Sequence, residues 1–75
     1  MDKQEFLAKF AEQFEDTDPE EIQLNTVFHE LEEWSSIIGM CILALAKADY
    51  GKSISSDELK KCVKVEDVYN LIANK

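Results

Sequence analysis

The stretch Trp34-Ser35-Ser36-Ile37 joins a long acidic segment to the most apolar helical segment of the chain. The Ser35 hydroxyl can accept a hydrogen bond from a backbone N–H group at the start of a helix, so Ser35 is predicted to be the N-cap. Ser36 is then the first helical residue, whose side chain points outward where backbone N–H groups and the helix dipole favour a phosphate group. The simpler interpretation, two capping serines without a ligand, stays open at this point.

The helix that follows is predicted to run from Ser36 to about Tyr50 and to end at Gly51 in a left-handed conformation. Gly39 lies inside it and is expected to pack closely against a neighbouring backbone. Helical periodicity gives this helix two apolar faces. One face consists of Ile42, Leu43, Ala46 and Tyr50, and the second of Ile37, Cys41, Ala44, Ala48 and Leu45. Three other short helices cannot cover both faces, so we expect the second to be partly exposed or to border a cavity.

An earlier helix is predicted from Asp2 to about Phe14, because Phe6, Phe10 and Phe14 recur at a spacing of four residues. Asp2 and Glu5 form a pattern like a capping box at its start. An aromatic stripe at helical spacing can also be the face that binds a cofactor. A domain of 75 residues needs these rings for its core, and we therefore assign them to the core.

The connection from Asp16 to Trp34 is long for a compact domain. Apolar residues spaced along it are expected to pin it across the helix ends: Ile22, Leu24, Val27, Phe28, Leu31 and Trp34. Asp16-Thr17-Asp18 is similar to the start of a calcium loop, but the glycine and the glutamate that such a loop needs later are missing. His29 has no serine or cysteine partner placed by a motif, so we expect a surface or loop residue and not a base.

Two further helices are predicted downstream. Ser55 and Glu58 form a capping-box pattern that predicts a short helix from Ser55 to about Cys62. The last helix is predicted from Val65, because its apolar residues follow the i, i+3, i+4, i+7 spacing: Val65, Val68, Tyr69 and Ile72. The predicted fold class is all-α, a single domain over residues 1–75 with three longer helices and one short helix around one core.

Charge and composition exclude several classes of function. The net charge of −8 argues against nucleic acid and anionic membrane surfaces as partners. The longest apolar run is far shorter than the ~20 residues of a membrane span, and no secretory signal is visible, so we expect a cytoplasmic monomer. Cys41 and Cys62 match neither a disulfide framework nor a zinc motif, and no metal site is expected. The sequence contains neither a motif that pairs a nucleophile with a base nor a glycine-rich loop, so no feature suggests an enzyme.

In order along the chain, these features resemble the acyl carrier protein family over nearly the whole length. The resemblance is carried by Phe28-x-x-Leu31, Trp34-Ser35-Ser36-Ile37, the apolar helix ending in Tyr50-Gly51, Ile54, the short helix, and Val65-x-Asp67-Val68 with Leu71-Ile72. The family signature is Asp-Ser-Leu at the start of the second helix. Its modified serine falls on Ser36, its Asp on Ser35 and its Leu on Ile37.

The resemblance implies a bundle that carries 4′-phosphopantetheine on Ser36, transferred from coenzyme A by a separate phosphopantetheinyl transferase. The thiol of this arm would hold an acyl or aminoacyl group as a thioester. Acyl-transfer, synthase or ligase enzymes of fatty-acid, polyketide or related biosynthesis would then use it, and the carrier itself would not be an enzyme. The face expected to meet the acyl chain or a partner consists of Ile37, Met40, Cys41, Ala44 and Ala48.

Two departures from the family pattern refine this expectation. Ser35 stands in place of the signature Asp and keeps the capping oxygen without the carboxylate. Places that are acidic in carriers of fatty-acid synthesis hold other residues here, namely Ile38, Cys41, Lys47 and Ala48. The resemblance therefore favours a carrier for a specialised pathway. The alternative from another class is an unmodified helical interaction module that binds a partner through the apolar face of the same helix.

Overall fold

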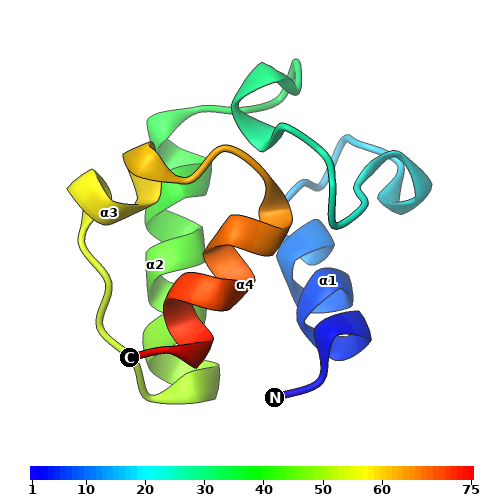
Figure 1. The fold of residues 1–75 in the computed structure, drawn as a ribbon. Coiled ribbons are helices and arrows are strands. Elements are labelled where there is room, and N and C mark those ends of the chain that lie inside the picture. The colour runs from blue at the N-terminus through cyan, green and yellow to red at the C-terminus, as the bar shows by residue number, and fades with distance from the viewer.

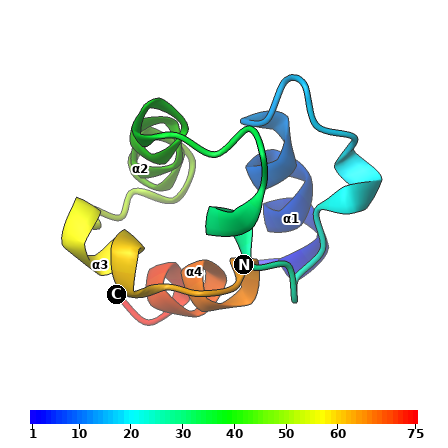
Figure 2. The same ribbon diagram turned by 90° about the horizontal axis from the view of Figure 1, so that it is seen from above.

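The computed structural model describes the whole chain, residues 1 to 75, as four α-helices without β-strands (Figure 1). The helices are α1 (Lys3–Glu12), α2 (Ser36–Tyr50), α3 (Ser56–Lys61) and α4 (Val65–Ala73). Helices α1, α2 and α4 surround the core, and the short α3 lies beside α2 and α4 (Figure 2). The predicted small all-α bundle is confirmed. None of the helices combines the length and the apolar character needed to span a bilayer.

Helix α1 begins as predicted but ends earlier. The Asp2 carboxylate accepts a hydrogen bond from the Gln4 N–H group at 2.9 Å. The predicted capping box is only half formed, because the Glu5 carboxylate instead pairs with Lys9 at 3.1 Å. Gln13 is the C-cap, so Phe14 lies just beyond the helix. Its ring is nevertheless buried, because the chain turns after Gln13 and keeps Phe14 in the core.

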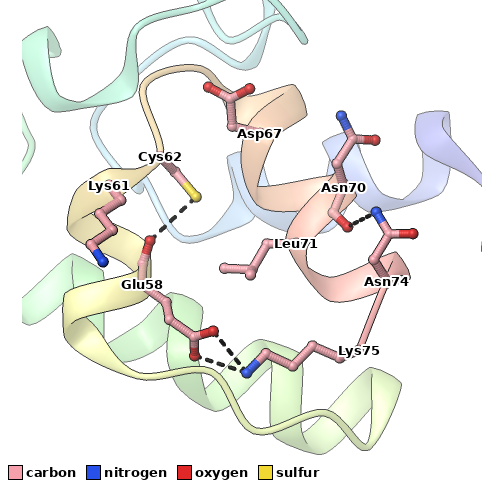
Figure 3. Close-up of a pocket in the computed structure, with 8 residues that line it drawn as sticks. All are labelled: Glu58, Lys61, Cys62, Asp67, Asn70, Leu71, Asn74 and Lys75. Carbon is pink, nitrogen blue, oxygen red and sulfur yellow. Dashed lines mark hydrogen bonds and ion pairs between the residues drawn. The ribbon is translucent and has the colours of Figure 1, made fainter.

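Helix α3 is fixed by a capping box at its start and by an ion pair with a residue at the end of α4. The Ser55 hydroxyl accepts from the Glu58 N–H group at 3.0 Å, and the Glu58 carboxylate accepts from the Ser55 N–H group at 2.9 Å. This confirms the predicted capping box. The other Glu58 oxygen pairs with the Lys75 ammonium at 2.8 Å and so ties α3 to the end of α4 (Figure 3).

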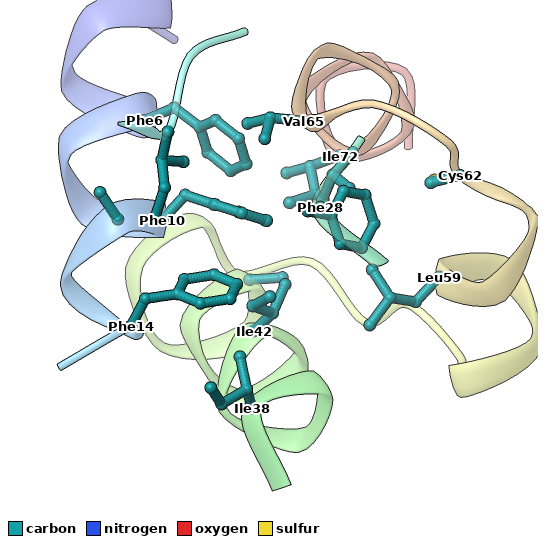
Figure 4. Packing of buried hydrophobic residues seen from close by; sticks show 14 of the residues in the cluster. Phe6, Phe10, Phe14, Phe28, Ile38, Ile42, Leu59, Cys62, Val65 and Ile72 are labelled. Carbon is teal, nitrogen blue, oxygen red and sulfur yellow. The ribbon is translucent and has the colours of Figure 1, made fainter. Parts of the chain in front are cut away.

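The core consists of 15 buried residues from every helix and from the first connection. The rings of Phe6, Phe10 and Phe14 all point into it and are at most 2% exposed (Figure 4). Phe28 enters from the connection and meets Phe10 edge-on, with ring centroids 5.5 Å apart. The stripe of α4 is buried through Val65, Val68 and Ile72. The assignment of the aromatic stripe to the core is therefore confirmed.

The first connection is anchored across the helix ends, as predicted. It contains two 3-10 turns, η1 (Pro19–Glu21) and η2 (Phe28–Glu30), which were not predicted from the sequence. Ile22 and Phe28 are buried, and Leu24, Leu31 and Trp34 are partly buried against the core. Val27, which was also expected as an anchor, is not among the residues packed there. The connection is also hydrogen-bonded to the first turn of α4. The Val65 N–H group donates to the Thr26 carbonyl at 3.1 Å, and the Glu66 N–H group donates to the Leu24 carbonyl at 2.9 Å.

The two faces of α2 differ from the prediction at Leu43 and Leu45. Leu45 was expected on the open face but is buried, whereas Leu43 was expected in the core and is only partly buried. Ile42 lies at the centre of the buried side with no exposed surface. At about 100° per residue, Leu45 is about 60° from Ile42 around the helix and Leu43 about 100°. The nearer of the two is therefore the one that is buried.

Candidate functional site

Ser35 and Ser36 occupy the start of α2 as predicted. Ser35 has extended backbone angles, φ −155° and ψ 168°, and its hydroxyl accepts from the Ile38 N–H group at 3.4 Å. Its carbonyl accepts the first intrahelical hydrogen bond, from the Gly39 N–H group at 3.0 Å. Ser36 is the first residue of the helix, is exposed and is not used as a cap. The site therefore leaves one exposed serine hydroxyl without a capping role at the positive end of a helix dipole.

Trp34 holds the residues before the two serines in place. The Trp34 ring meets Phe28 edge-on with centroids 5.2 Å apart, and the backbone N–H group of Trp34 donates to the Leu31 carbonyl at 3.0 Å. On its other side it packs against α2 at Gly39, where a Cβ atom would lie 3.4 Å from the Trp34 ring and 3.6 Å from a Leu59 methyl group. The neighbours of Gly39 are thus two side chains and not the backbone that we expected.

His29 lies in the first connection as predicted, within η2, and is partly buried. Its ring centroid lies 4.3 Å from that of Phe28 and 4.6 Å from that of Trp34. The Nε2 atom is buried and has no hydrogen-bond partner within the chain. Neighbouring aromatic rings explain this packing, which no sequence motif indicated. His29 accordingly helps to fix Trp34 and, through it, the start of α2.

Acidic side chains gather just before the site. The Glu33 carboxylate accepts from the Thr17 hydroxyl at 2.6 Å and from the Asp16 N–H group at 3.1 Å, which ties this segment to the start of the connection. A depression of about 600 Å³ is lined there by Asp16, Thr17, Glu21, Glu30, Leu31, Glu32 and Glu33. No group of His, Cys, Asp or Glu side chains in the chain is arranged to hold a metal ion. The depression is therefore an acidic part of the surface.

The outward side of α2 is apolar, and we call it the outer face: Ile37, Met40, Cys41, Ala44 and Ala48. All five residues are exposed, and Ile37 and Met40 leave 73% and 68% of their surface uncovered. The only charged side chain between Ser36 and Ala48 is Lys47. The expectation of a partly exposed second face is confirmed for these residues, because no other helix packs over them. Large exposed apolar side chains in a cluster are typical of a binding surface.

A groove between α1 and α2 adjoins the outer face, and we call it the α1–α2 groove. It has a volume of about 430 Å³ and is lined by Cys41, Ala44, Leu45 and Ala48 from α2 and by Lys9, Glu12, Gln13 and Asp49 around it. The Lys9 ammonium pairs with the Asp49 carboxylate at 3.2 Å and so joins the two helices. This groove depends on the position of α1 beside α2, which was not predicted from the sequence.

A further recess lies between α3 and α4 and has a volume of about 570 Å³ (Figure 3). Most of the residues that line it are polar, and they include Asn70, Asn74 and the Glu58–Lys75 pair beside Cys62. The Cys62 thiol donates to the Glu58 carbonyl at 3.5 Å, and burial raises its pKa above the ordinary value of 9.0. A thiol with a raised pKa is a poor nucleophile at neutral pH. Cys62 therefore serves the packing of α3.

The chain matches no family model, no curated protein and no solved structure. Its candidate site is consequently defined by its own geometry. That geometry is an exposed serine hydroxyl at the start of a capped helix, with an apolar surface next to it.

Proposed function

We propose that the chain is a carrier protein that holds an acyl or aminoacyl group as a thioester on 4′-phosphopantetheine attached to Ser36. The observation that carries this proposal is the division between the two serines. Ser35 caps α2, and Ser36 leaves an uncommitted hydroxyl at the first helical position. The resemblance to acyl carrier proteins places their modified serine at the same residue.

The chemistry of attachment suits this position. The Ser36 oxygen forms a bond to the phosphorus that carries the pantetheine, adenosine 3′,5′-bisphosphate leaves, and the serine proton is released. The N–H groups of Ser36 and Ile37 precede the first intrahelical hydrogen bond of α2 and are free to face the resulting phosphodiester. No arginine is needed for this, and the chain contains none.

The protein does no chemistry of its own in this proposal. Its arm raises the local concentration of the thioester at each enzyme that it visits. These enzymes are the phosphopantetheinyl transferase and the acyl-transfer, synthase or ligase enzymes of a specialised biosynthetic pathway. The outer face lacks the acids of fatty-acid carriers, which supports a dedicated pathway over a housekeeping one.

The test is an intact mass measurement after incubation with coenzyme A and a broad-specificity phosphopantetheinyl transferase. We expect one phosphopantetheine adduct on the unaltered protein and on Ser35→Ala, and none on Ser36→Ala. The two variants are matched, because each removes one hydroxyl from neighbouring residues. Loss of the adduct in Ser35→Ala with retention in Ser36→Ala would reverse the assignment.

A second candidate function is an unmodified interaction module, and the exposure of Ile37 and Met40 favours it. These side chains form a binding surface whether or not Ser36 is modified. The same mass measurement separates the two functions. If no adduct forms with any transferase while the protein is folded, the unmodified module becomes the better proposal.

A further inference from the structure

We propose that an unbranched apolar acyl group carried on Ser36 lies outside the bundle, in the α1–α2 groove, and not in the interior between α2 and α3. This inference rests on the proposed carrier function and names where its cargo lies. It follows from three features: a filled interior behind Ser36, an apolar path that starts beside Ser36, and a groove at the end of that path.

The interior behind Ser36 is filled by packed side chains. Gly39 faces inward one turn after Ser35, and even a methyl group there would touch both Trp34 and Leu59 at 3.4 to 3.6 Å. Leu59 is 3% exposed and Ile42 is not exposed at all, and both point into the same core (Figure 4). Interiors packed in this way resist insertion, because added methylenes force side chains off their preferred rotamers.

The apolar path runs down one side of α2. Counted from Ser36 at about 100° per residue, Ile37, Cys41, Ala44 and Ala48 all lie within about 60° of one another around the helix. They begin at the residue next to the attachment site and continue for three turns. Cys41 lies about 7 Å and Ala48 about 18 Å along the axis from Ser36. A flexible arm on Ser36 can therefore follow exposed apolar surface without a break.

The α1–α2 groove suits an apolar chain of limited length. Its floor consists of Leu45 and of the small side chains at Cys41, Ala44 and Ala48, so a chain can approach the helix closely. The Lys9–Asp49 ion pair crosses between the helices near the end remote from Ser36. The stretch from Cys41 to Ala48 is about 10 Å long. Burial of apolar area there favours an apolar chain.

The experiment compares two cargoes on the same protein. The transferase loads Ser36 with the arm from acetyl-coenzyme A or from octanoyl-coenzyme A, and mass spectrometry verifies the adduct. Amide and methyl NMR signals of the two forms are then compared. We expect the differences to concentrate at Cys41, Ala44 and Ala48. Differences at Ile42 and Leu59 would overturn the inference in favour of an internal chain. The absence of any difference would also overturn it, because the octanoyl chain would then not contact the groove.

A pair of matched variants strengthens the experiment. Ala44→Glu places a charge in the α1–α2 groove, whereas Ala8→Glu makes the same change at an exposed position of α1 outside it. We expect Ala44→Glu to lower the occupancy of the groove by the octanoyl chain about tenfold, the equivalent of roughly 1.4 kcal/mol or two buried methylenes. Ala8→Glu should leave it unchanged. Equal occupancy in both variants would contradict the inference, while a missing adduct would already contradict the carrier function.

Discussion

At the scale of single residues, Ser35 and Ser36 have the same side chain but different backbone conformations. Ser35 is still extended and directs its oxygen at the Ile38 N–H group, whereas Ser36 is already helical and exposed. The structural role and the proposed chemical role therefore fall on different residues. One can be altered without the other.

This separation predicts different stabilities for substitutions at the two serines. Ser35→Ala removes the cap and should lower the free energy of unfolding by about 0.5 to 1 kcal/mol, at the low end of cap effects because the bond is long at 3.4 Å. Ser35→Asp keeps the cap and adds a favourable charge at the helix start, so it should raise stability by about 0.3 to 1 kcal/mol. Ser36→Ala should stay within about 0.5 kcal/mol of the unaltered protein.

Urea unfolding followed by Trp34 fluorescence measures these differences. Trp34 is the only tryptophan and packs against the start of α2, so its emission reports on this region. A larger loss for Ser36→Ala than for Ser35→Ala would mean that the capping residue is Ser36.

At the scale of elements, α2 is the helix on which both core and surface depend. Its inward side buries Ile38, Ile42, Leu45 and Ala46, and its outward side exposes the outer face. It ends at Gly51, whose φ of 65° turns the chain toward α3. One element thus contributes to the packing of the bundle and to the proposed path of the cargo.

The two sides of α2 should respond differently to substitution. Ile42→Ala leaves a cavity at a fully buried position and should cost about 2 to 5 kcal/mol, a large part of the stability of a domain of this size. Leu43→Ala should cost less, because Leu43 is only partly buried. Ala44→Ser on the outer face should change stability by no more than about 0.5 kcal/mol. Denaturant melts that gave equal losses for Ile42→Ala and Ala44→Ser would show that both sides are buried.

At the scale of the whole molecule, the bundle is closed by interactions between distant segments. Lys52 donates to the carbonyl of Lys75, and the Tyr69 hydroxyl donates to the Met1 carbonyl at 2.7 Å. The Asp67 carboxylate accepts from the N–H groups of Val63 and Lys64 at 3.0 and 2.9 Å and so secures the start of α4. Several of these contacts involve groups that titrate.

Stability should therefore fall at acidic pH. The pKa of Glu58 is lowered, first by the Lys75 ammonium, and that of Asp67 is lowered, first by the Lys64 N–H group. A carboxyl group whose pKa is lower in the folded chain stabilises the fold above its unfolded pKa. This stabilisation is lost as the pH falls through the folded pKa. We expect the free energy of unfolding to decrease below about pH 4, and the decrease to be smaller in Asp67→Asn.

At alkaline pH the relevant pKa values are raised in the fold, not lowered, and stability is again expected to fall. Burial raises the pKa of Cys62 and of Tyr50 above their ordinary values of 9.0 and 10.0. The neutral forms are favoured in the fold, so this contribution is lost as the pH rises above about 9. Urea melts across the pH range check both limbs. A stability that is flat from pH 3 to 6 would contradict the proposed role of the two carboxyl groups.

The sequence by itself determined the features that depend on neighbours within about one helical turn. The start of α2 at Ser36, its end at Gly51 and the capping box of Ser55 and Glu58 could be predicted for this reason. Each depends on hydrogen bonds between residues that are close along the chain. The same reasoning placed Ser36 at the candidate site.

Only the tertiary structure decided which apolar residues of α2 are covered and what surrounds them. Leu43 and Leu45 are equally apolar in the sequence, and only the packed bundle shows that Leu45 is the buried one. His29 is packed because Phe28 and Trp34 meet there. The α1–α2 groove likewise exists because α1 is joined to α2 through Lys9 and Asp49. These features depend on contacts between residues far apart in sequence, which periodicity and capping patterns do not encode.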